Sequence, residues 1–349
     1  MNDAYASSGV DTAAADRGVA ALVSVLKTID TGRSSRMVPL PGHYAAVLEV
    51  APNLGIAVGT DGVGSKLIVA EQAGRFDTVG IDCVAMNAND VVCVGAEPIA
   101  LLDYLAVERI DEAVMRAIGE GLKAGAEAAG VEIPGGEVAV LPELIRGHPS
   151  PGGLDLTAAC FGTVALDALV TGRDCHPGDV LVGLPSSGLH SNGYSLARQA
   201  LSGLDLDDRP SPLAGVTVAD ALLEPTVIYV RAVLELLRSG LRVHGLAHIT
   251  GGGLLNLLRL NPNVGFEIAD PLPVPPVFGL VRDLGGIADA EMWEVFNMGC
   301  GFCAVLPQTT ADAGAALLAA HHPGARRIGT VTGRAGTVDV PGLGISLRG

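Results

Sequence analysis

The sequence predicts a two-domain protein of the α/β or α+β class. Strand-like and helix-like segments alternate along most of the chain, which is the pattern of these classes. The 349 residues exceed what a single hydrophobic core usually serves, and 49% of them are apolar. No apolar run approaches the roughly 20 residues of a membrane span. These observations indicate a soluble, globular protein with a sizeable core.

The expected elements of the first half follow from periodicity and turn residues. A peripheral segment of about 35 residues contains an amphipathic helix over 16–28. We then expect a strand over 54–60, a helix from 67, a short strand over 79–81 leading into a helix from 82, a strand over 99–107, a helix over 111–129 that ends at Gly130, and a strand over 154–165. A glycine-containing segment over 134–137 is expected between the last two.

A change in the pattern over 166–179 places the domain boundary there, so the domains are expected at 1–167 and 168–349. The second half is expected to contain a strand over 180–184, a polar loop over 185–193, helices to about 202 and over 225–239, a glycine turn at 251–253 that opens another helix, a proline-rich loop over 271–276, and strands over 296–306 and 326–332.

The charge pattern argues against a nucleic-acid or membrane partner. The formal net charge is −16, and no block rich in Lys or Arg is present. An acidic protein that handles phosphates needs local cations, and a divalent metal held by carboxylates would supply them. The N-terminus reads Met1-Asn2-Asp3 and lacks a basic, apolar leader, which favours the cytoplasm.

The cysteines and two histidines give little support for a metal or redox motif. Six cysteines show no regular framework, so free buried thiols are expected. Cys300 and Cys303 have the spacing of a redox or zinc pair, but residues three apart on a strand point to opposite faces. His244 and His248 have helical spacing, yet Gly245 lies between them and no HExxH glutamate is present.

The segment 59–66 (GTDGVGSK) places a carboxylate, three glycines and a lysine within eight residues, between a strand and a helix. Backbone N–H groups at such a turn can bind phosphate. The order Gly64-Ser65-Lys66 differs from the Gly-Lys-Ser/Thr of a P-loop. Two readings remain open: a phosphate site built on Gly62, Gly64, Ser65 and Lys66, and a glycine-rich turn with a solvated lysine.

Four acidic residues of the first half are candidate metal ligands: Asp61, Asp82, Asp90 and Glu137. On a helix that begins at Asp82, positions 82, 86, 89 and 90 share one side. Each acid also has a structural reading, since Asp82 is suited to cap the helix, Asp90 could be solvated and Glu137 could be a loop acid. The apolar residues around Asp90 make a solvated face less expected, and buried carboxylates need a metal or hydrogen-bond donors.

The segment 185–195 (PSSGLHSNGYS) gathers hydroxyls, an imidazole and an amide between a strand and a helix. It could bind a polyhydroxylated or phosphorylated ligand, or be a polar turn with capping serines. His190 adds the group best suited to proton transfer near neutral pH. The segment 248–253 (HITGGG) could likewise serve phosphate or merely allow close packing.

Together these segments resemble the phosphoribosylformylglycinamidine cyclo-ligase family, also called aminoimidazole ribonucleotide synthetase, in the form of its archaeal-like branch. The resemblance is collinear over almost the whole chain. It rests on 59–66, 80–90 (GIDCVAMNAND), 95–98 (GAEP), 135–137 (GGE), 186–195, 224–226 (EPT), 248–253 and 296–299 (FNMG).

The resemblance implies a two-domain ATP-binding synthetase fold. The N-terminal domain would form a dimeric β-barrel with a second copy, and the C-terminal domain would be an α/β sandwich. The implied reaction closes the imidazole ring of purine biosynthesis. Formylglycinamidine ribonucleotide and ATP give aminoimidazole ribonucleotide, ADP and phosphate, with Mg²⁺ as cofactor. Phosphorylation turns the amide oxygen into a leaving group, and a nitrogen of the amidine then attacks that carbon.

The resemblance also implies residue roles. Mg²⁺ would be held by Asp61, Asp82, Asp90 and Glu137. The ATP phosphates would be bound by Gly62, Gly64, Ser65, Lys66, Gly135 and Gly136. The ribonucleotide would be bound by Ser187, Gly188, His190, Ser191 and Asn192. The catalytic residues would be His190, Asp90 and Lys66, with His190 as the proposed acid or base.

The chain also departs from the family pattern. Segment 39–45 reads PLPGHYA instead of a glycine-rich stretch, Val140 replaces a second glutamate, and Ala6 replaces a lysine. Alternatives are therefore a sister enzyme of the selenophosphate synthetase or thiamine-monophosphate kinase type, a non-catalytic nucleotide-binding paralogue, and a thiol-redox protein based on Cys300 and Cys303.

Overall fold

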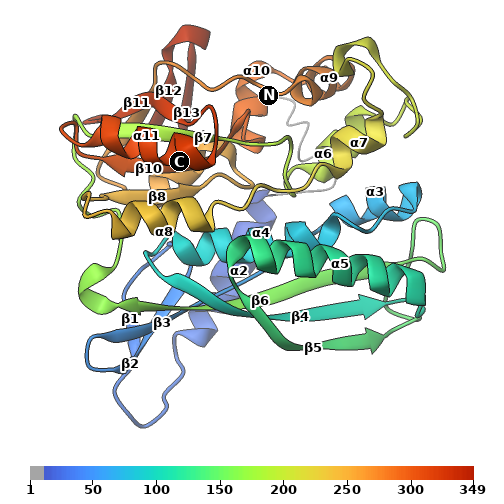
Figure 1. The fold of residues 1–349 in the computed structure, drawn as a ribbon, viewed down its shortest axis with the longest axis horizontal. Helices are drawn as coiled ribbons and strands as arrows, with labels where there is room; N and C mark the ends of the chain where they lie inside the picture. The colour runs from blue at the N-terminus through green and yellow to red at the C-terminus, as the bar shows by residue number, and fades with distance from the viewer. Residues whose placement is uncertain (1–11) are drawn as a thin grey trace.

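The protein contains two β-sheets, one for each half of the chain, with a layer of helices between them (Figure 1). The computed structural model describes residues 12–349, so Ala6 lies outside the described residues. The first sheet ends with strand β6 at Ala165, and the second begins with strand β7 at Val180. The expected boundary after residue 167 falls in this connection, which also contains a short 3₁₀ helix, η1 (Leu166–Ala168).

The first domain has a six-stranded sheet in the order β1-β2-β3-β6-β4-β5. Its strands are β1 (Met37–Val38), β2 (Ala46–Ala51), β3 (Leu54–Gly62), β4 (Glu97–Val107), β5 (Glu132–Val140) and β6 (Leu154–Ala165). Its helices are α2 (Thr12–Leu26), α3 (Lys66–Ala73), α4 (Val79–Val92) and α5 (Glu112–Ala129). β4 and β5, which α5 connects along the chain, pair in parallel, and the other pairs of this sheet are antiparallel.

The ends and packing of these helices follow from the sequence. Asp111 caps α5 by accepting hydrogen bonds from the amides of Ala113 and Val114, and Gly130 ends it in the left-handed conformation. α4 packs closely on α5 because Gly80 faces Gly121, where a Cβ on either would overlap backbone atoms of the other helix or its flanks. α4 is buried on nearly all sides, which places it between the two sheets.

The second domain has a seven-stranded sheet in the order β13-β12-β9-β11-β7-β10-β8. Its strands are β7 (Val180–Pro185), β8 (Gly245–His248), β9 (Gly265–Ile268), β10 (Cys300–Leu306), β11 (Arg326–Thr332), β12 (Thr337–Val340) and β13 (Ile345–Arg348). Its helices are α6 (Tyr194–Ala200), α7 (Val218–Leu223), α8 (Val230–Arg238), α9 (Pro276–Gly285), α10 (Asp289–Val295) and α11 (Ala311–His321), with 3₁₀ segments η2 (Ser211–Leu213), η3 (Gly253–Arg259) and η4 (Pro341–Leu343).

Several expectations about elements were wrong. Residues 79–81 are the first turn of α4 and not a strand. The GGE segment lies within strand β5, because its backbone pairs with β4 although two glycines and a proline disfavour a strand. The helix expected after the turn at 251–253 is the 3₁₀ segment η3. The helix expected over 225–239 begins only at Val230.

A β-bulge corrects the expectation for Cys300 and Cys303. The register of β10 against β7 shifts between Cys300 and Phe302, so one residue is inserted and the alternation of faces is broken. The two Sγ atoms therefore lie 3.5 Å apart on one side. Both thiols are free and buried.

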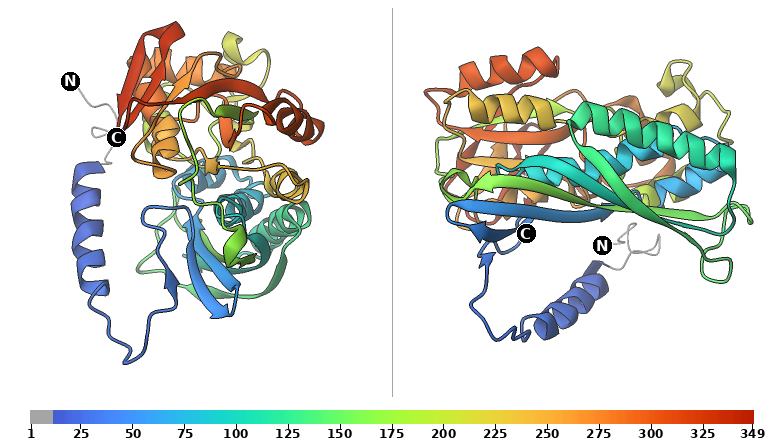
Figure 2. Two further views of the ribbon diagram at one scale, coloured as in Figure 1. Left: turned by 90° about the vertical axis from the view of Figure 1, so that its left-hand side faces the viewer. Right: turned by 60° about the horizontal axis from the view of Figure 1, so that its bottom comes forward.

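Helix α2 stands away from both domains, and the outer face of the first sheet is uncovered (Figure 2). Large apolar side chains are exposed on both: Val19, Leu22, Val25 and Leu26 on α2, and Leu48, Leu54, Leu102 and Tyr104 on the sheet. Among the helices of residues 12–349, none is long and apolar enough to cross a membrane.

Candidate functional site

The candidate site lies where α3, α4 and the end of β3 in the first domain meet loops of the second domain. The second domain contributes the loop 186–193, the segment 224–229 and the end of β8. Direct hydrogen bonds cross this boundary. Asn89 of α4 donates to the carbonyl of Val227 at 2.9 Å and accepts from the amide of Tyr229 at 2.9 Å. The two domains therefore form one continuous polar interface around α4.

The glycine turn follows β3 and opens α3. Asp61 is held at the end of β3 because Asn87 accepts a hydrogen bond from its amide and donates to its carbonyl, at 2.9 and 3.1 Å. Gly64 adopts φ +69°, a conformation that glycine reaches without strain. Within the described part of the chain, the amides of Gly64 and Ser65 donate to no protein acceptor. These two amides are available to an oxyanion.

Lys66 does not reach toward this turn. Its side chain is fully buried, and its ammonium lies 2.8 Å from the Asp82 carboxylate. It also donates to two carbonyl oxygens of the second domain, those of His190 at 3.1 Å and Glu224 at 2.7 Å. All three donors of the ammonium are thereby used. Burial lowers the pKa of Lys66, and the charge of Asp82 opposes that effect.

The Asp82 carboxylate is likewise occupied by protein partners. Besides Lys66, its carboxylate accepts hydrogen bonds from the amide and the hydroxyl of Thr226, at 2.8 and 2.6 Å. Its side chain is fully buried in this set of partners. The structure thus places Lys66 and Asp82 in a buried contact between the domains, apart from the open amides of the glycine turn and from the exposed side of Asp90.

The loop 186–193 is anchored on its inner side. Ser187 donates to the carbonyl of Pro225 at 2.6 Å, and Ser186 donates to Asn297 at 2.8 Å. Asn297 in turn donates to the carbonyl of Gly188 at 2.9 Å. The hydroxyl of Ser191 and the amide of Asn192 are only partly buried, and Asn192 lies beside Met86 of α4. The expected ligand-binding loop therefore faces α4 across the boundary.

His190 lies inside this loop and its imidazole is buried, with 1% of the residue exposed. Its backbone is left-handed, with φ +61°, and Nε2 accepts a hydrogen bond from the amide of Ser187 at 3.3 Å. Nδ1 has no hydrogen-bond partner among the described residues. Burial, and then the charges of His248 and Lys66, hold the pKa of His190 well below its usual range, so the ring is neutral.

A glycine on β10 leaves the space that the His190 ring occupies. A Cβ at Gly301 would overlap the His190 ring and the hydroxyl of Tyr229. Tyr229 donates from that hydroxyl to the carbonyl of Pro185 at 2.8 Å. The end of β7, the imidazole and β10 are thus packed together without room for another methyl group.

Asp90 and His248 form a second contact between the domains. His248 Nδ1 lies 2.8 Å from Asp90 Oδ1, with the imidazole fully buried and the carboxylate side chain 19% exposed. Burial raises the pKa of Asp61, and the negative charge of Asp90 adds to that rise. Asp61 and Asp90 therefore lie near each other, and no lysine ion-pairs with either within residues 12–349.

A further carboxylate, Asp103, was missing from the sequence prediction. Asp61, Ala158 and Asp103 occupy one row across β3, β6 and β4, with Gly136 next on β5. Burial raises the pKa of Asp103, and a Cβ at Gly136 would overlap its carboxylate. The signal in the sequence is the alternation over 101–105, where Asp103 takes an inward position between Leu101 and Leu105. No sequence signal pairs His248 with Asp90, because that contact joins residues 158 apart in the chain.

Glu137 is not brought to this row. It pairs with Tyr104, one residue beyond the Gly136–Asp103 pair, so its side chain belongs to the outer face of the sheet. It is exposed, as is Gly135. The two glycines of GGE lie in a strand and do not form a turn around an anion in this structure.

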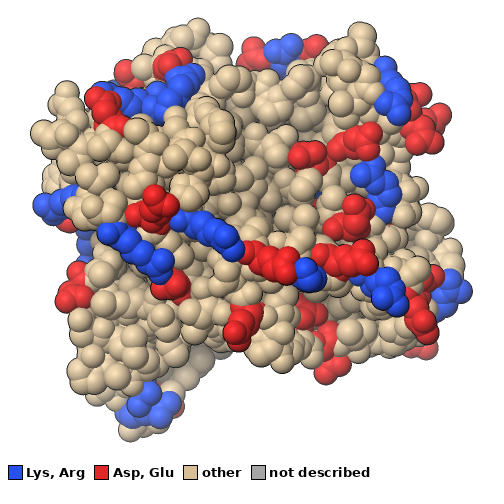
Figure 3. Space-filling model, in the orientation of Figure 1, with Lys and Arg blue, Asp and Glu red and all other residues tan. Residues whose placement is uncertain are grey.

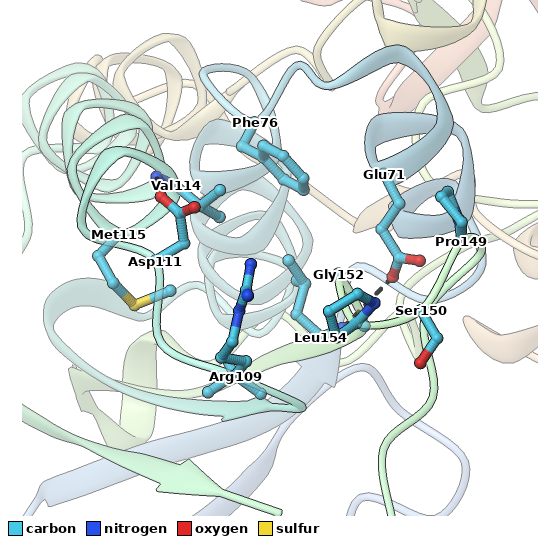
Figure 4. Close-up of a pocket in the computed structure, with 13 residues that line it drawn as sticks. Glu71, Phe76, Arg109, Asp111, Val114, Met115, Pro149, Ser150, Gly152 and Leu154 are labelled. Atoms are coloured by element: carbon cyan, nitrogen blue, oxygen red, sulfur yellow. Dashed lines mark hydrogen bonds between the residues drawn. The ribbon is translucent and has the colours of Figure 1, made fainter. Parts of the chain in front are cut away.

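A pocket lies elsewhere in the first domain (Figure 4). It has a volume of about 290 Å³ and is bounded by α3, the start of α5 and the loop 149–153. Phe76 and Arg109 extend toward it, and Glu71 accepts a hydrogen bond from the amide of Leu154 at 3.3 Å. None of the residues expected to bind ATP, metal or ribonucleotide lines this pocket.

The surface charges are intermixed. On the face shown in Figure 3, Lys and Arg side chains lie beside Asp and Glu side chains along the middle of the molecule. The exposed ion pairs of the described residues include Arg238 with Glu97. This face offers no continuous basic track.

Comparison with known proteins identifies the fold first. Residues 42–164 match the N-terminal domain, and 176–340 the C-terminal domain, of AIR synthase related proteins. Solved structures with this fold include a HypE–HypF complex (TM-score 0.63, 19% identity, 88% of this chain and 92% of that chain) and AaThiL complexed with AMPPCP and TMP (TM-score 0.62, 17% identity, 87% and 89%). The chain therefore has the two-domain architecture of the AIR synthase related proteins.

Sequence relatives narrow this class. The phosphoribosylformylglycinamidine cyclo-ligase of Methanothermobacter thermautotrophicus is 47% identical over 339 residues, covering 96% of each chain. The protein of the same name from Thermococcus kodakarensis is 45% identical and covers 98% of this chain and 99% of its own. The chain belongs to the phosphoribosylformylglycinamidine cyclo-ligase family.

Proposed function

We propose that the protein catalyses the ATP-dependent closure of formylglycinamidine ribonucleotide to aminoimidazole ribonucleotide, with release of ADP and phosphate. One observation carries the proposal. Lys66, directly after the glycine turn, and Met86 of α4 contact the loop 186–192, and Asp90 of the same helix contacts His248 of β8 across the same domain interface. Membership of the cyclo-ligase family supports it. The cytoplasm stays the predicted compartment.

Mg²⁺ would be held by Asp61, Asp90 and Asp103. The donors are all carboxylate oxygens, the ligands that this hard cation prefers. Desolvation raises the pKa of Asp61 and of Asp103, and Asp90 is the added negative charge near Asp61, which is the electrostatic setting that a cation relieves. When bound, the metal would offset the charge of the ATP phosphates. Asp82 and Glu137 are left out of this set because their surroundings separate them from it.

The phosphates would be bound by the amides of Gly64 and Ser65 at the start of α3. This replaces the role first expected for Lys66, whose three donors are used. Gly62 makes room for the turn, because a Cβ there would meet the Thr157 side chain at 2.9 Å. Gly135 and Gly136 would contribute space beside Asp103 instead of a second set of open amides.

The ribonucleotide would contact the partly exposed groups of the loop, Ser191 and Asn192. His190 would act as a positioning residue, since its buried, neutral ring supports the loop from within. Its carbonyl accepts from Lys66, so the same residue links the loop to the first domain. In the proposed reaction, phosphorylation of the amide oxygen creates the leaving group, and the attacking nitrogen closes the ring with loss of phosphate.

A stoichiometric turnover assay tests the proposal. Purified protein, Mg²⁺, ATP and formylglycinamidine ribonucleotide are combined, and ADP and the new aromatic amine are followed together. We expect equal amounts of both products, lost in Asp90→Asn. ADP without the amine would indicate a sister kinase-like activity, and ATP binding without either product would indicate a non-catalytic paralogue.

Two variants separate the roles of His190. If the imidazole only supports the loop, His190→Gln should retain most of the maximal rate and mainly raise KM for the ribonucleotide. His190→Ala should lower the maximal rate as well as raise KM. A pH profile unchanged in His190→Gln would support the positioning role. Loss of the maximal rate in both variants, with an altered pH profile, would instead make His190 the acid or base.

We further propose that the protein is a homodimer formed through the outer face of the first sheet. Four large side chains of that face are each 41% exposed: Leu48, Leu54, Leu102 and Tyr104. A sheet face of this kind is usually covered. Sedimentation velocity should show a dimer that Leu102→Glu dissociates. A wild-type monomer at micromolar concentration would contradict the proposal.

A further inference from the structure

A cluster of metal-ligating side chains lies in the second domain, away from the site described above. His176, Asp179 and His244 each offer one ligand atom, and these atoms lie within 4.8 Å of one another. His244 directly precedes β8, and His248 ends that strand. At about 3.3 Å per residue, four residues separate this cluster from Asp90 and its surroundings by roughly 13 Å.

The topology explains why these residues meet. β7 and β8 both pair with β10 in antiparallel fashion, so both begin at the same edge of the sheet. Asp179 immediately precedes β7, and His244 immediately precedes β8. The turn before β7 then folds back, because the amide of Asp179 donates to the carbonyl of His176 at 3.1 Å.

The donor atoms already face one another. Asp179 Oδ2 lies 2.7 Å from His244 Nδ1 and accepts a hydrogen bond from the amide of His176 at 2.9 Å. The rings of His176 and His244 pack edge to face, with centroids 6.3 Å apart. Asp179 has no Lys or Arg partner within residues 12–349, because nearby Arg242 pairs with Asp174 at 2.9 Å. The carboxylate therefore contacts the His244 imidazole and the His176 amide, while His176 Nδ1 lies 2.5 Å from the carbonyl of Asp174.

We propose that His176, Asp179 and His244 form a zinc site that ties the connection between the domains to the second sheet. Two imidazoles and one carboxylate suit Zn²⁺, with water as the fourth ligand. Ligand atoms of a tetrahedral zinc centre are about 3.3 Å apart. The Asp179–His244 pair, at 2.7 Å, would widen slightly, and the pairs with His176, all within 4.8 Å, would close by at most about 1.5 Å. His176 can supply that movement, since it is exposed on a turn.

The test uses full-length protein stripped with EDTA, kept reduced, and supplied with excess Mg²⁺ so that the carboxylates of the first site are occupied. Zn²⁺ binding is measured by calorimetry, and Co²⁺ is used as an absorbing substitute. We expect one equivalent of Zn²⁺ in the wild type and an affinity lower by roughly tenfold or more in His176→Ala. His176→Ala is chosen because it leaves the buried Asp179–His244 contact in place.

Two control variants make the result specific. His321→Ala removes an exposed histidine that pairs with Glu235, and it should bind zinc like the wild type. Asp61→Asn should also retain the zinc equivalent, because it alters only the first site. Absence of a zinc equivalent in folded wild-type protein, or equal affinity in wild type and His176→Ala, would overturn the proposal. Loss of the equivalent in Asp61→Asn would assign the zinc to the first site and equally overturn it.

Discussion

His248 Nδ1 lies 2.8 Å from Asp90 Oδ1, and this contact joins the last residue of β8 to α4 of the other domain. One oxygen of the carboxylate is thereby directed to the imidazole, and the negative charge of this partly exposed side chain helps raise the pKa of Asp61. A buried histidine in this position orients a carboxylate as the outer partner of a metal ligand does. The domain interface and the proposed metal site are therefore linked through a single side chain.

The first prediction follows from this contact. His248→Gln should raise the Mg²⁺ concentration needed for half-maximal turnover by roughly 10- to 100-fold, because the Asp90 carboxylate loses its orienting partner. Turnover measured across a Mg²⁺ titration provides the check, with His321→Gln as an exposed control. An unchanged Mg²⁺ dependence would show that His248 serves folding alone.

The second prediction compares two acids on opposite faces of the first sheet. Asp103→Asn should likewise raise the Mg²⁺ concentration needed for half-maximal turnover, since Asp103 shares a row with Asp61. Glu137→Gln should leave it unchanged, because Glu137 belongs to the outer face. The reverse order of effects would restore the ligand set that the sequence alone predicts.

The third prediction concerns the buried pair of Lys66 and Asp82. Lys66→Met should lower the free energy of unfolding by about 3–5 kcal/mol, because it leaves the Asp82 carboxylate buried without its counter-charge. Urea unfolding measures this. Lys123→Met is the matched control, since Lys123 pairs with Glu127 on the surface with side chains 70% and 64% exposed. That pair should contribute at most about 0.5 kcal/mol. Similar losses in both variants would contradict the assignment.

The prediction of the fold succeeded where the local pattern and the tertiary structure agree. The helix over 111–129 has a capping aspartate and a terminal glycine, and α5 matches it. The strand over 154–165 alternates buried and exposed residues, as β6 does. By contrast, the GGE segment becomes a strand only because β4 lies beside it, and no local signal reports that neighbour.

The site was predictable in its parts but not in its pairings. The sequence indicated Lys66, Asp82 and His190 as candidate site residues. The contact between Lys66 and the carbonyl of His190, however, joins residues 124 apart in the chain and crosses the domain boundary. A bulge in β10 reversed the expected orientation of Cys300 relative to Cys303. Such long-range contacts and local irregularities depend on packing that periodicity does not describe.

The fourth prediction is a pH dependence of stability. Burial, and then the charge of Arg259, lower the pKa of His43 to about 4. Between about pH 6.5 and 4 the unfolded chain takes up a proton that native His43 does not, so stability is lost as the pH falls through that window. The expected slope from one such group is about 1.4 kcal/mol per pH unit. Urea unfolding at several pH values should show a shallower dependence in His43→Gln, with exposed His148→Gln as control. Parallel curves for His43→Gln and wild type would contradict it.

The fifth prediction concerns the cysteine pair. Cys300→Ser should retain full turnover under reducing conditions, because neither thiol is needed in the proposed reaction. The hydrogen bond with Cys300 and burial raise the pKa of Cys303 well above its usual range, so the thiol stays protonated. Steady-state kinetics of Cys300→Ser and Cys303→Ser provide the check. A large loss of the maximal rate in both variants, with unchanged unfolding, would favour a thiol-based activity.

The acceptors that Lys66 meets in the second domain are main-chain oxygens, those of His190 and Glu224. Side chains at 190 and 224 can therefore be exchanged during evolution without altering the bond, whereas the path of the backbone cannot. A chimaera that joins the first domain of this chain to the second domain of a distant relative should keep these two Lys66 bonds wherever the two carbonyls keep their positions. Insertions of even one residue near either carbonyl should be tolerated far less than substitutions.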